Sequence, residues 1–246
     1  MENYSRMIGH IFGQYVKPVA RFKMLGDNKY QPIKAVGTGF TFGAGVFVTC
    51  WHCVGEPLAT DEVFGVPIHS DGEHNSGMAT LNDLARDENG SDLALAQVNI
   101  ELRYGFRLAD EAVGWGEDVV ACGYPLPTNT VDPETGTTLI QTQARVLRGY
   151  VMSEMMDDLH SQKQSRVYEL DMPAPRWSSG SPLFRRDPFE VVGVVLGEST
   201  KSIGEEDEPF AYSLAHHLDV VANAHTSVAT GGETLRDYLD SNKKAP

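Results

Sequence analysis

Three polar residues in this sequence could together turn a hydroxyl into a nucleophile. His52 follows a short apolar run, Asp92 directly precedes another, and Ser179 lies in a Ser-Ser-Gly-Ser-Pro run. Acyl transfer by a serine needs a nucleophile, a base that takes its proton, and donors aimed at the developing oxyanion. Ser179 would supply the hydroxyl and His52 would act as general base and then as general acid. Asp92 would orient the imidazole and stabilise its charged form.

The neighbours of Ser179 favour it over the other serines in the run. Gly180 permits a tight turn where a side chain would obstruct approach, and Pro182 stiffens the exit from the turn. Ser178 and Ser181 have an ordinary role as turn formers. Four other aspartates lie between His52 and Asp92 in polar surroundings, where we expect them to be solvated: Asp61, Asp71, Asp83 and Asp87.

The elements that must position these residues are mostly short strands with frequent turns between them. Such a pattern is typical of antiparallel barrels or sandwiches and not of βαβ units. Residues 61–89 are polar and predict a turn-rich loop, and residues 155–164 predict a short helix or a loop. Helices are predicted at 215–224 and 234–242, the second capped by Thr234 or the glycines before it. Strands are predicted at 16–25, 35–42, 46–50, 93–98, 118–124, 137–152, 166–171, 190–197 and 210–214.

Composition argues against two classes of partner. The chain has 246 residues and a formal net charge of −14, whereas nucleic-acid binding needs a basic face. The same charge disfavours adsorption to anionic membranes, and no apolar run approaches the length that spans a bilayer. We therefore expect neither a nucleic-acid nor a membrane partner.

The cysteine pattern and the first residues indicate the cellular compartment in which the protein works. Three cysteines, two of them separated by only two residues, do not make a disulfide framework. The first ten residues lack a basic segment followed by an apolar one, so they do not resemble a signal peptide. A reducing, cytoplasmic setting is the expectation.

Several segments, taken in order, resemble the trypsin-like (chymotrypsin-fold) serine peptidases. The Ser179-Gly180-Ser181-Pro182 run is similar to the bacterial glutamyl-endopeptidase branch, whereas Ala94 and the segment 210–214 are similar to the HtrA/DegP branch. The segments that carry the family resemblance are Gly37–Phe40, Phe47–Val54, Asp92–Leu95, Asp118–Pro125 and Leu170–Asp171 leading to Ser179.

The resemblance implies an all-β protein of two antiparallel six-stranded barrels with a catalytic cleft between them and a short C-terminal helix. It also implies a serine endopeptidase with His52, Asp92 and Ser179 as its triad, a protein or peptide substrate, and no cofactor or metal. We expect a single peptidase domain over 1–246, with barrels at about 14–112 and 116–225 and a helix at 233–242.

The resemblance also assigns the remaining parts of the site. The oxyanion hole would be formed by the backbone N–H groups of Trp177 and Ser179, although the family usually has glycine at the first position and Asp or Asn at Ser178. If residue 177 needs a positive φ, tryptophan costs about 1–3 kcal/mol there, which suggests a slow or switchable enzyme. The primary pocket would be lined by part of the strand Val195–Ser199 and by a preceding segment, in full Met172, Pro173, Ala174, Gly197 and Ser199.

The pocket residues predict which substrate side chain the primary pocket accepts. Pro173 stands where trypsins carry an acid, so we expect a small or medium apolar side chain in the pocket instead of Lys or Arg. The acidic loop 205–208 could contact basic substrate residues, although a solvated loop is the simpler expectation.

Three other functions compete with the hydrolase. Cys50-Trp51-His52-Cys53 has the C-x-x-C spacing of thiol–disulfide oxidoreductases, but that chemistry normally sits in a βαβ unit. His69 and His74 match no standard zinc-ligand spacing, and an exposed loop is the alternative. The third is a protease-like binding module whose oxyanion hole is broken by Trp177 and which a regulatory protein partner could activate.

Overall fold

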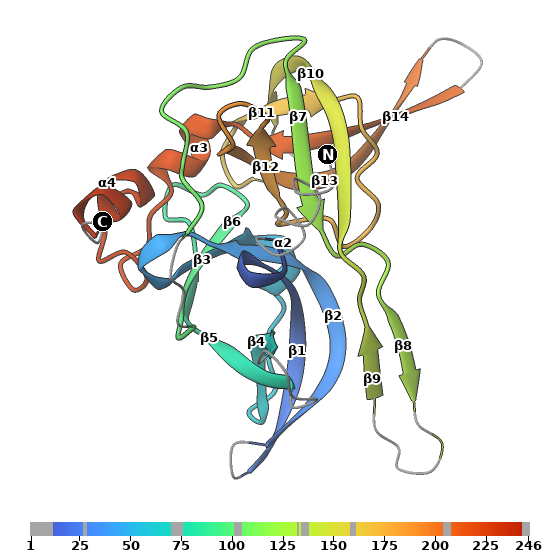
Figure 1. Cartoon of the computed structure of the whole chain (residues 1–246), viewed down its shortest axis with the longest axis vertical. Coiled ribbons are helices and arrows are strands. Elements are labelled where there is room, and N and C mark those ends of the chain that lie inside the picture. Colours follow the sequence, from blue (N-terminus) through green and yellow to red (C-terminus); the bar gives the residue numbers. More distant parts are fainter. Residues whose placement is uncertain are drawn as a thin grey trace.

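A computed structural model describes residues 12–26, 29–69, 76–100, 105–131, 133, 138–157, 161–203 and 208–242. Two closed antiparallel barrels of six strands each make up the molecule, one below the other in Figure 1. The expected all-β, chymotrypsin-like architecture is therefore confirmed. Within the described helices, none is long and apolar enough to cross a membrane.

The first barrel has the strand order β1-β2-β3-β6-β5-β4. β3 is continuously buried because it is an apolar run at the centre of this barrel, paired with β2 on one side and β6 on the other. It ends in the single-turn helix α2, which carries His52. The elements of this half are β1 (Val16–Gly26), β2 (Lys29–Thr41), η1 (Gly43–Gly45), β3 (Val46–Cys50), α2 (Trp51–Val54), β4 (Glu62–His69), β5 (Ser76–Arg86) and β6 (Leu93–Val98).

The second barrel has the strand order β10-β11-β14-β13-β12-β7. β12 and β13 form a hairpin-like pair, and the loop ahead of β12 carries Ser179. The elements of this half are β7 (Asp118–Gly123), β8 (Thr128–Val131), β9 (Thr138–Gln141), β10 (Arg145–Asp157), β11 (Ser165–Leu170), β12 (Pro182–Arg185), β13 (Glu190–Ile203) and β14 (Glu208–His216), then the helices α3 (Leu218–Asn223) and α4 (Leu235–Ser241).

The predicted loop at 61–89 is wrong over most of its length, and the short helix or loop predicted at 155–164 is wrong for its first residues. Much of segment 61–89 forms β4 and β5, which pair with each other and close the first barrel against β1 and β6. Phe64 and Val66 of β4 and Ala79 and Leu81 of β5 are buried and contribute to the core of this barrel. The segment from 155 onward continues β10 to Asp157, because β11 pairs with it residue by residue. In both places the pairing of the backbone outweighs the polar composition.

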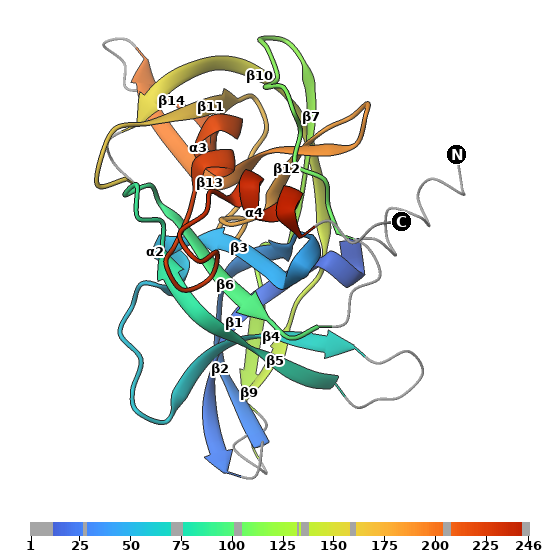
Figure 2. The ribbon, with the colours of Figure 1, turned by 90° about the vertical axis from the view of Figure 1, so that its left-hand side faces the viewer.

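The C-terminal helices link the two barrels. α3 follows β14 and packs near the second barrel, whereas Gln97 of β6 donates to the carbonyl of Ala229 just before α4 (Figure 2). Thr234 caps α4 by accepting a hydrogen bond from the Asp237 N–H, as predicted. The ribbon β8–β9 extends from the second barrel along β2 of the first (Figure 1).

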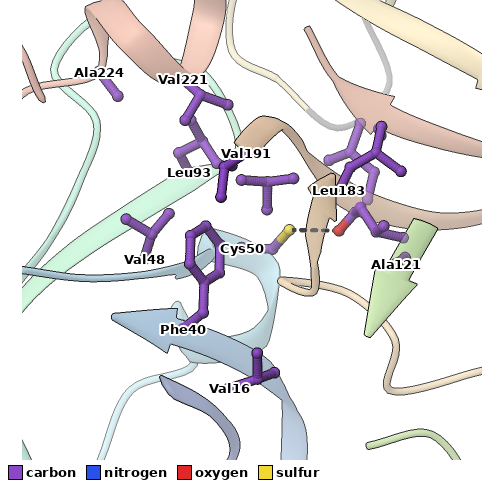
Figure 3. Packing of buried hydrophobic residues seen from close by; sticks show 14 of the residues in the cluster. Val16, Phe40, Val48, Cys50, Leu93, Ala121, Leu183, Val191, Val221 and Ala224 are labelled. Carbon is purple, nitrogen blue, oxygen red and sulfur yellow. Dashed lines mark hydrogen bonds between the residues drawn. The ribbon is translucent and has the colours of Figure 1, made fainter. Parts of the chain in front are cut away.

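The barrels share an apolar core at their junction. Figure 3 shows Phe40 and Cys50 of the first barrel facing Val191 and Leu183 of the second, all fully buried. The Cys50 thiol donates across this junction to the carbonyl of Val195 at 3.3 Å. Packing of this kind holds the helix that bears His52 against the strands that frame Ser179.

Candidate active site

The side chains of His52 and Asp92 form a hydrogen-bonded pair. The His52 ring nitrogen Nδ1 lies 2.5 Å from one carboxylate oxygen of Asp92, and the His52 backbone N–H donates to the other at 2.9 Å. The Trp51 N–H also donates to the backbone carbonyl of Asp92 at 2.8 Å. Side-chain exposure is 2% for Asp92 and 43% for His52, so the carboxylate is enclosed while the imidazole reaches solvent.

The charge of this pair favours a protonated imidazole. Burial lowers the pKa of His52, but the hydrogen bond to Asp92, followed by contacts with Cys53, outweighs burial and raises the pKa above its usual value. A buried carboxylate that accepts both bonds therefore makes the imidazole a stronger base. The carboxylate contact is made by the ring nitrogen Nδ1.

The loop that carries Ser179 is anchored to the first barrel by Thr38. The Thr38 N–H donates to the carbonyl of Ser179 at 2.9 Å, and the Thr38 hydroxyl donates to the carbonyl of Trp177 at 3.0 Å. The same hydroxyl accepts from the Tyr124 N–H at 3.0 Å. Gly180 has φ +86°, and a Cβ there would lie 1.9 Å from the carbonyl oxygen of Thr38. Only glycine fits this approach.

Trp177 has a φ of +69°, which is the positive φ that the sequence analysis considered for this position. For a large side chain this conformation costs about 1–3 kcal/mol, and the surrounding hydrogen bonds hold it in place. Among the described residues, neither the Trp177 N–H nor the Ser179 N–H has a hydrogen-bond acceptor. Both N–H groups are therefore available to an oxyanion.

The Ser179 hydroxyl donates to the backbone carbonyl of Leu196 at 2.6 Å. Its two rivals are enclosed: Ser178 and Ser181 are each 1% exposed, and neither hydroxyl has a partner within the described part of the chain. Ser179 is the serine of the run that opens to solvent. We conclude that only this hydroxyl can meet a substrate without movement of the loop.

A cleft of about 560 Å³ lies between the two barrels and contains both His52 and Ser179. Two of the predicted pocket residues line it, Ala174 and Gly197. Met172 is buried and Pro173 is exposed, and these two do not line it; nor does Ser199. The other lining residues are Val36, Pro175, Arg176, Trp177, Leu196 and Glu198.

Three of these lining residues were absent from the sequence analysis, namely Val36, Pro175 and Arg176. Arg176 directly precedes Trp177, so its closeness in sequence to the oxyanion-hole position was the available signal. Leu196 and Glu198 fall within the strand that was predicted to line the pocket, although neither was singled out. Val36 comes from the other barrel and carries no local signal.

The three cysteines, Cys50, Cys53 and Cys122, are buried free thiols. Burial, then the Asp92 carboxylate, raises the pKa of Cys50, and burial raises the pKa of Cys122 to about 12. A thiol with a raised pKa is a poor nucleophile, which argues against the oxidoreductase alternative at Cys50. Cys50, His52 and Asp92 offer ligand atoms within 4.8 Å of one another. A zinc ion there would compete with Asp92 for the imidazole.

The fold and the site together define a chymotrypsin-like protein with its cleft between two barrels. Residues 37–194 match the family described as trypsin-like peptidase domain, so this chain belongs to that family. The match spans the segments that hold His52, Asp92 and Ser179.

Solved structures support the fold. The Rv3671c protease of M. tuberculosis in its active form is 18% identical with a TM-score of 0.57, covering 92% of this chain and 85% of that one. An inactive form of the same protease is 18% identical with a TM-score of 0.54, covering 89% of this chain and 92% of that one. A search of curated proteins gave no match.

Proposed function

We propose that this chain is a serine endopeptidase that cleaves peptide bonds through an acyl-enzyme. The Ser179 hydroxyl oxygen attacks the substrate carbonyl while His52 takes its proton. The imidazolium, stabilised by Asp92, then gives that proton to the leaving amine as the C–N bond breaks. Water, activated by His52, hydrolyses the resulting ester and restores the serine.

The observation that carries this proposal is the His52–Asp92 pair, with Nδ1 and Oδ2 2.5 Å apart, facing the cleft that Ser179 also lines. The N–H groups of Trp177 and Ser179, which have no acceptor among the described residues, add two donors for the oxyanion. Losing one such donor typically costs 10²–10³ in rate, so two free donors support an active site. Ala174 and Gly197 are proposed to contact the substrate residue whose carbonyl is attacked.

One movement is required before the first step. The Ser179 hydroxyl must turn from the Leu196 carbonyl, at 2.6 Å, toward His52. An extended substrate has backbone N–H groups that can take over the Leu196 carbonyl. We therefore propose that substrate binding itself releases the nucleophile, at some cost in rate.

We also propose a branch of the family, a cellular compartment and a mode of regulation. The run Ser179-Gly180-Ser181-Pro182 supports the bacterial glutamyl-endopeptidase branch, whereas Ala94 and the segment 210–214 support the HtrA-like branch. The free thiols of Cys50, Cys53 and Cys122 support a reducing, cytoplasmic compartment. Regulation by a protein partner rests on Trp177 and Ser178, and rapid cleavage of unstructured casein by the isolated protein would remove the need for it.

A fluorophosphonate probe tests the nucleophile. The serine oxygen displaces fluoride from phosphorus and its proton passes to His52, so labelling reports both residues. We expect labelling of the intact protein and of Ser178→Ala, and none of Ser179→Ala or His52→Ala. Labelling that survives in Ser179→Ala would contradict the proposed nucleophile, and circular dichroism of each variant controls for folding.

A second candidate function is a protease-like binding module without catalysis. The hydrogen bond from Ser179 to Leu196 favours it, because the hydroxyl donates its proton to a backbone carbonyl and not to the base. Under this alternative the folded protein binds extended peptides but is not labelled by the probe over hours. Peptide binding by the unlabelled protein would therefore select the binding module.

A further inference from the structure

The cleft carries an acidic side chain that catalysis does not use. Glu198 lines it beside Gly197 and Leu196, and its side chain is exposed. Its carboxylate forms no ion pair or hydrogen bond with another described residue. Arg176 lines the cleft from the loop before Ser179 and is equally unpaired within the described ranges. Among the described residues, the cleft thus presents the Glu198 carboxylate and the Arg176 guanidinium, each without a side-chain partner.

Glu198 lies on an open edge of the second barrel. β12 pairs with β13 only as far as Val194, whereas β14 occupies the other edge of β13 and pairs with Gly197 and Glu198. Within the described strands, nothing pairs with the free edge of β13 from Gly197 to Ser199. An extended peptide can add to such an edge.

The position of Ser179 sets the register of that peptide. The Leu196 carbonyl oxygen is 2.6 Å from the Ser179 hydroxyl, and a reacting carbonyl must come within about 3–3.5 Å of the same hydroxyl. The substrate residue that bears this carbonyl therefore lies opposite Leu196. Its preceding residues must run toward Ser199, because β12 occupies the edge toward Val194. The residue two places before the cleaved one then lies opposite Glu198.

We propose that Glu198 selects peptides with lysine or arginine two residues before the residue whose carbonyl is attacked. Directly opposite residues on antiparallel strands point to the same face, and opposite charges there attract. This inference deepens the proposed function and rests on it. The acidic segment 205–208 cannot support it, because most of it lies outside the described residues.

Arg176 gives the inference an internal control. Since Arg176 adds a positive charge to the lining of the same cleft, a general attraction of the cleft for basic peptides is not expected. The preference should hold for the position opposite Glu198 alone. Lysine one residue nearer to the cleaved bond should not increase the rate in the same way, because alternate residues of a strand point to opposite faces.

The test uses quenched fluorescent peptides that differ only at that position, with lysine, glutamine or glutamate. The cleaved position carries an equimolar mixture of small and medium apolar residues, and mass spectrometry locates each cut. We expect kcat/KM about tenfold higher for the lysine peptide than for the glutamate peptide, because exposed attraction and repulsion each contribute a few-fold. In 0.5 M salt the Debye length falls to about 5 Å, so the charges are screened and the lysine-to-glutamate ratio of kcat/KM should fall.

Variants assign the preference to one side chain. Glu198→Gln should bring the lysine-to-glutamate ratio close to one, and Glu198→Lys should invert it. Glu233→Gln makes the same change in net charge at an exposed site outside the cleft and should leave the ratio near tenfold. Equal rates for both peptides in the intact protein, or an unchanged ratio in Glu198→Gln, would overturn the inference.

A binding measurement separates this inference from the proposed catalysis. In full-length Ser179→Ala, fluorescence anisotropy should show tighter binding of the lysine peptide, and the second change Glu198→Gln should abolish the difference. If neither peptide is cut by the intact protein but the binding difference is present, the catalytic proposal fails and the role of Glu198 stands. Equal binding of both peptides overturns that role.

Discussion

At the scale of single residues, the chemistry depends on how a buried carboxylate changes its neighbours. Asp92 has almost no exposed surface, and both of its carboxylate oxygens contact His52, one at the ring nitrogen Nδ1 and one at the backbone N–H. This fixes which ring nitrogen remains for the serine. The same enclosure raises the pKa of Cys50 and makes its thiol inert.

The raised pKa of His52 predicts an alkaline pH profile. Only the neutral imidazole can accept the serine proton, so kcat/KM should rise with pH, with a midpoint above the usual value of about 6.5. The charged pair stabilises the fold fully below that usual value and loses this contribution as pH rises through the folded pKa. Initial rates between pH 5 and 10 on one peptide measure the midpoint. Activity that peaks below pH 6 would contradict the assignment of His52 as base.

The positive φ of Trp177 predicts a difference between two small replacements. Trp177→Gly and Trp177→Ala both remove the indole, but only alanine keeps a Cβ at φ +69°. We expect the glycine variant to have a free energy of unfolding about 1 kcal/mol higher than the alanine variant. Urea denaturation of both proteins provides the comparison. An alanine variant of equal or greater stability would show that the backbone strain is absent.

At the scale of elements, the site is a loop and a one-turn helix, each of which is held by the other barrel. α2 is too short to be stable alone and is placed by the end of β3 and the hydrogen bonds to Asp92. The loop 177–181 is placed by Thr38 of β2 and by the bond from the Gly180 N–H to Val195. Neither element could hold its residue in isolation.

Removal of the Thr38 hydroxyl should loosen this loop. Thr38→Val leaves the Tyr124 N–H and the Trp177 carbonyl without their partner, and Thr38 is fully buried. We expect a loss of about 1–3 kcal/mol in the free energy of unfolding and slower fluorophosphonate labelling. Thr38→Ser keeps the hydroxyl and should recover most of the labelling rate. Equal labelling of the valine and serine variants would argue that Thr38 does not position the loop.

At the scale of the whole molecule, the junction between the barrels determines whether the site exists. Ala174, Ser179 and Glu198 come from the second barrel, whereas His52 and Val36 come from the first. The junction core and the C-terminal helices hold these walls together. The cleft should therefore be lost together with the junction when the protein unfolds.

Alkylation of the buried thiols should report the loss of the junction on unfolding. Cys50 and Cys122 have raised pKa values and at most 1% exposure, so in a Cys53→Ala background iodoacetamide should react only through unfolded molecules. The rate should rise with urea in parallel with the loss of peptide cleavage. Rapid alkylation of the native protein would show that the junction opens locally.

The sequence by itself determined the order and chemical types of the site residues, most of the strands, and the Thr234 cap. These depend on neighbours close in the chain, namely apolar runs that end at His52 or begin after Asp92, and a side chain that caps its own helix. Only the tertiary structure decided that β4 and β5 are strands, because both are stabilised by backbone pairing with distant segments. It also decided that Thr38 holds the nucleophile loop and that Arg176 and Glu198 share one cleft. Contacts between residues so far apart in sequence exist only once both barrels have closed, and no local pattern encodes them.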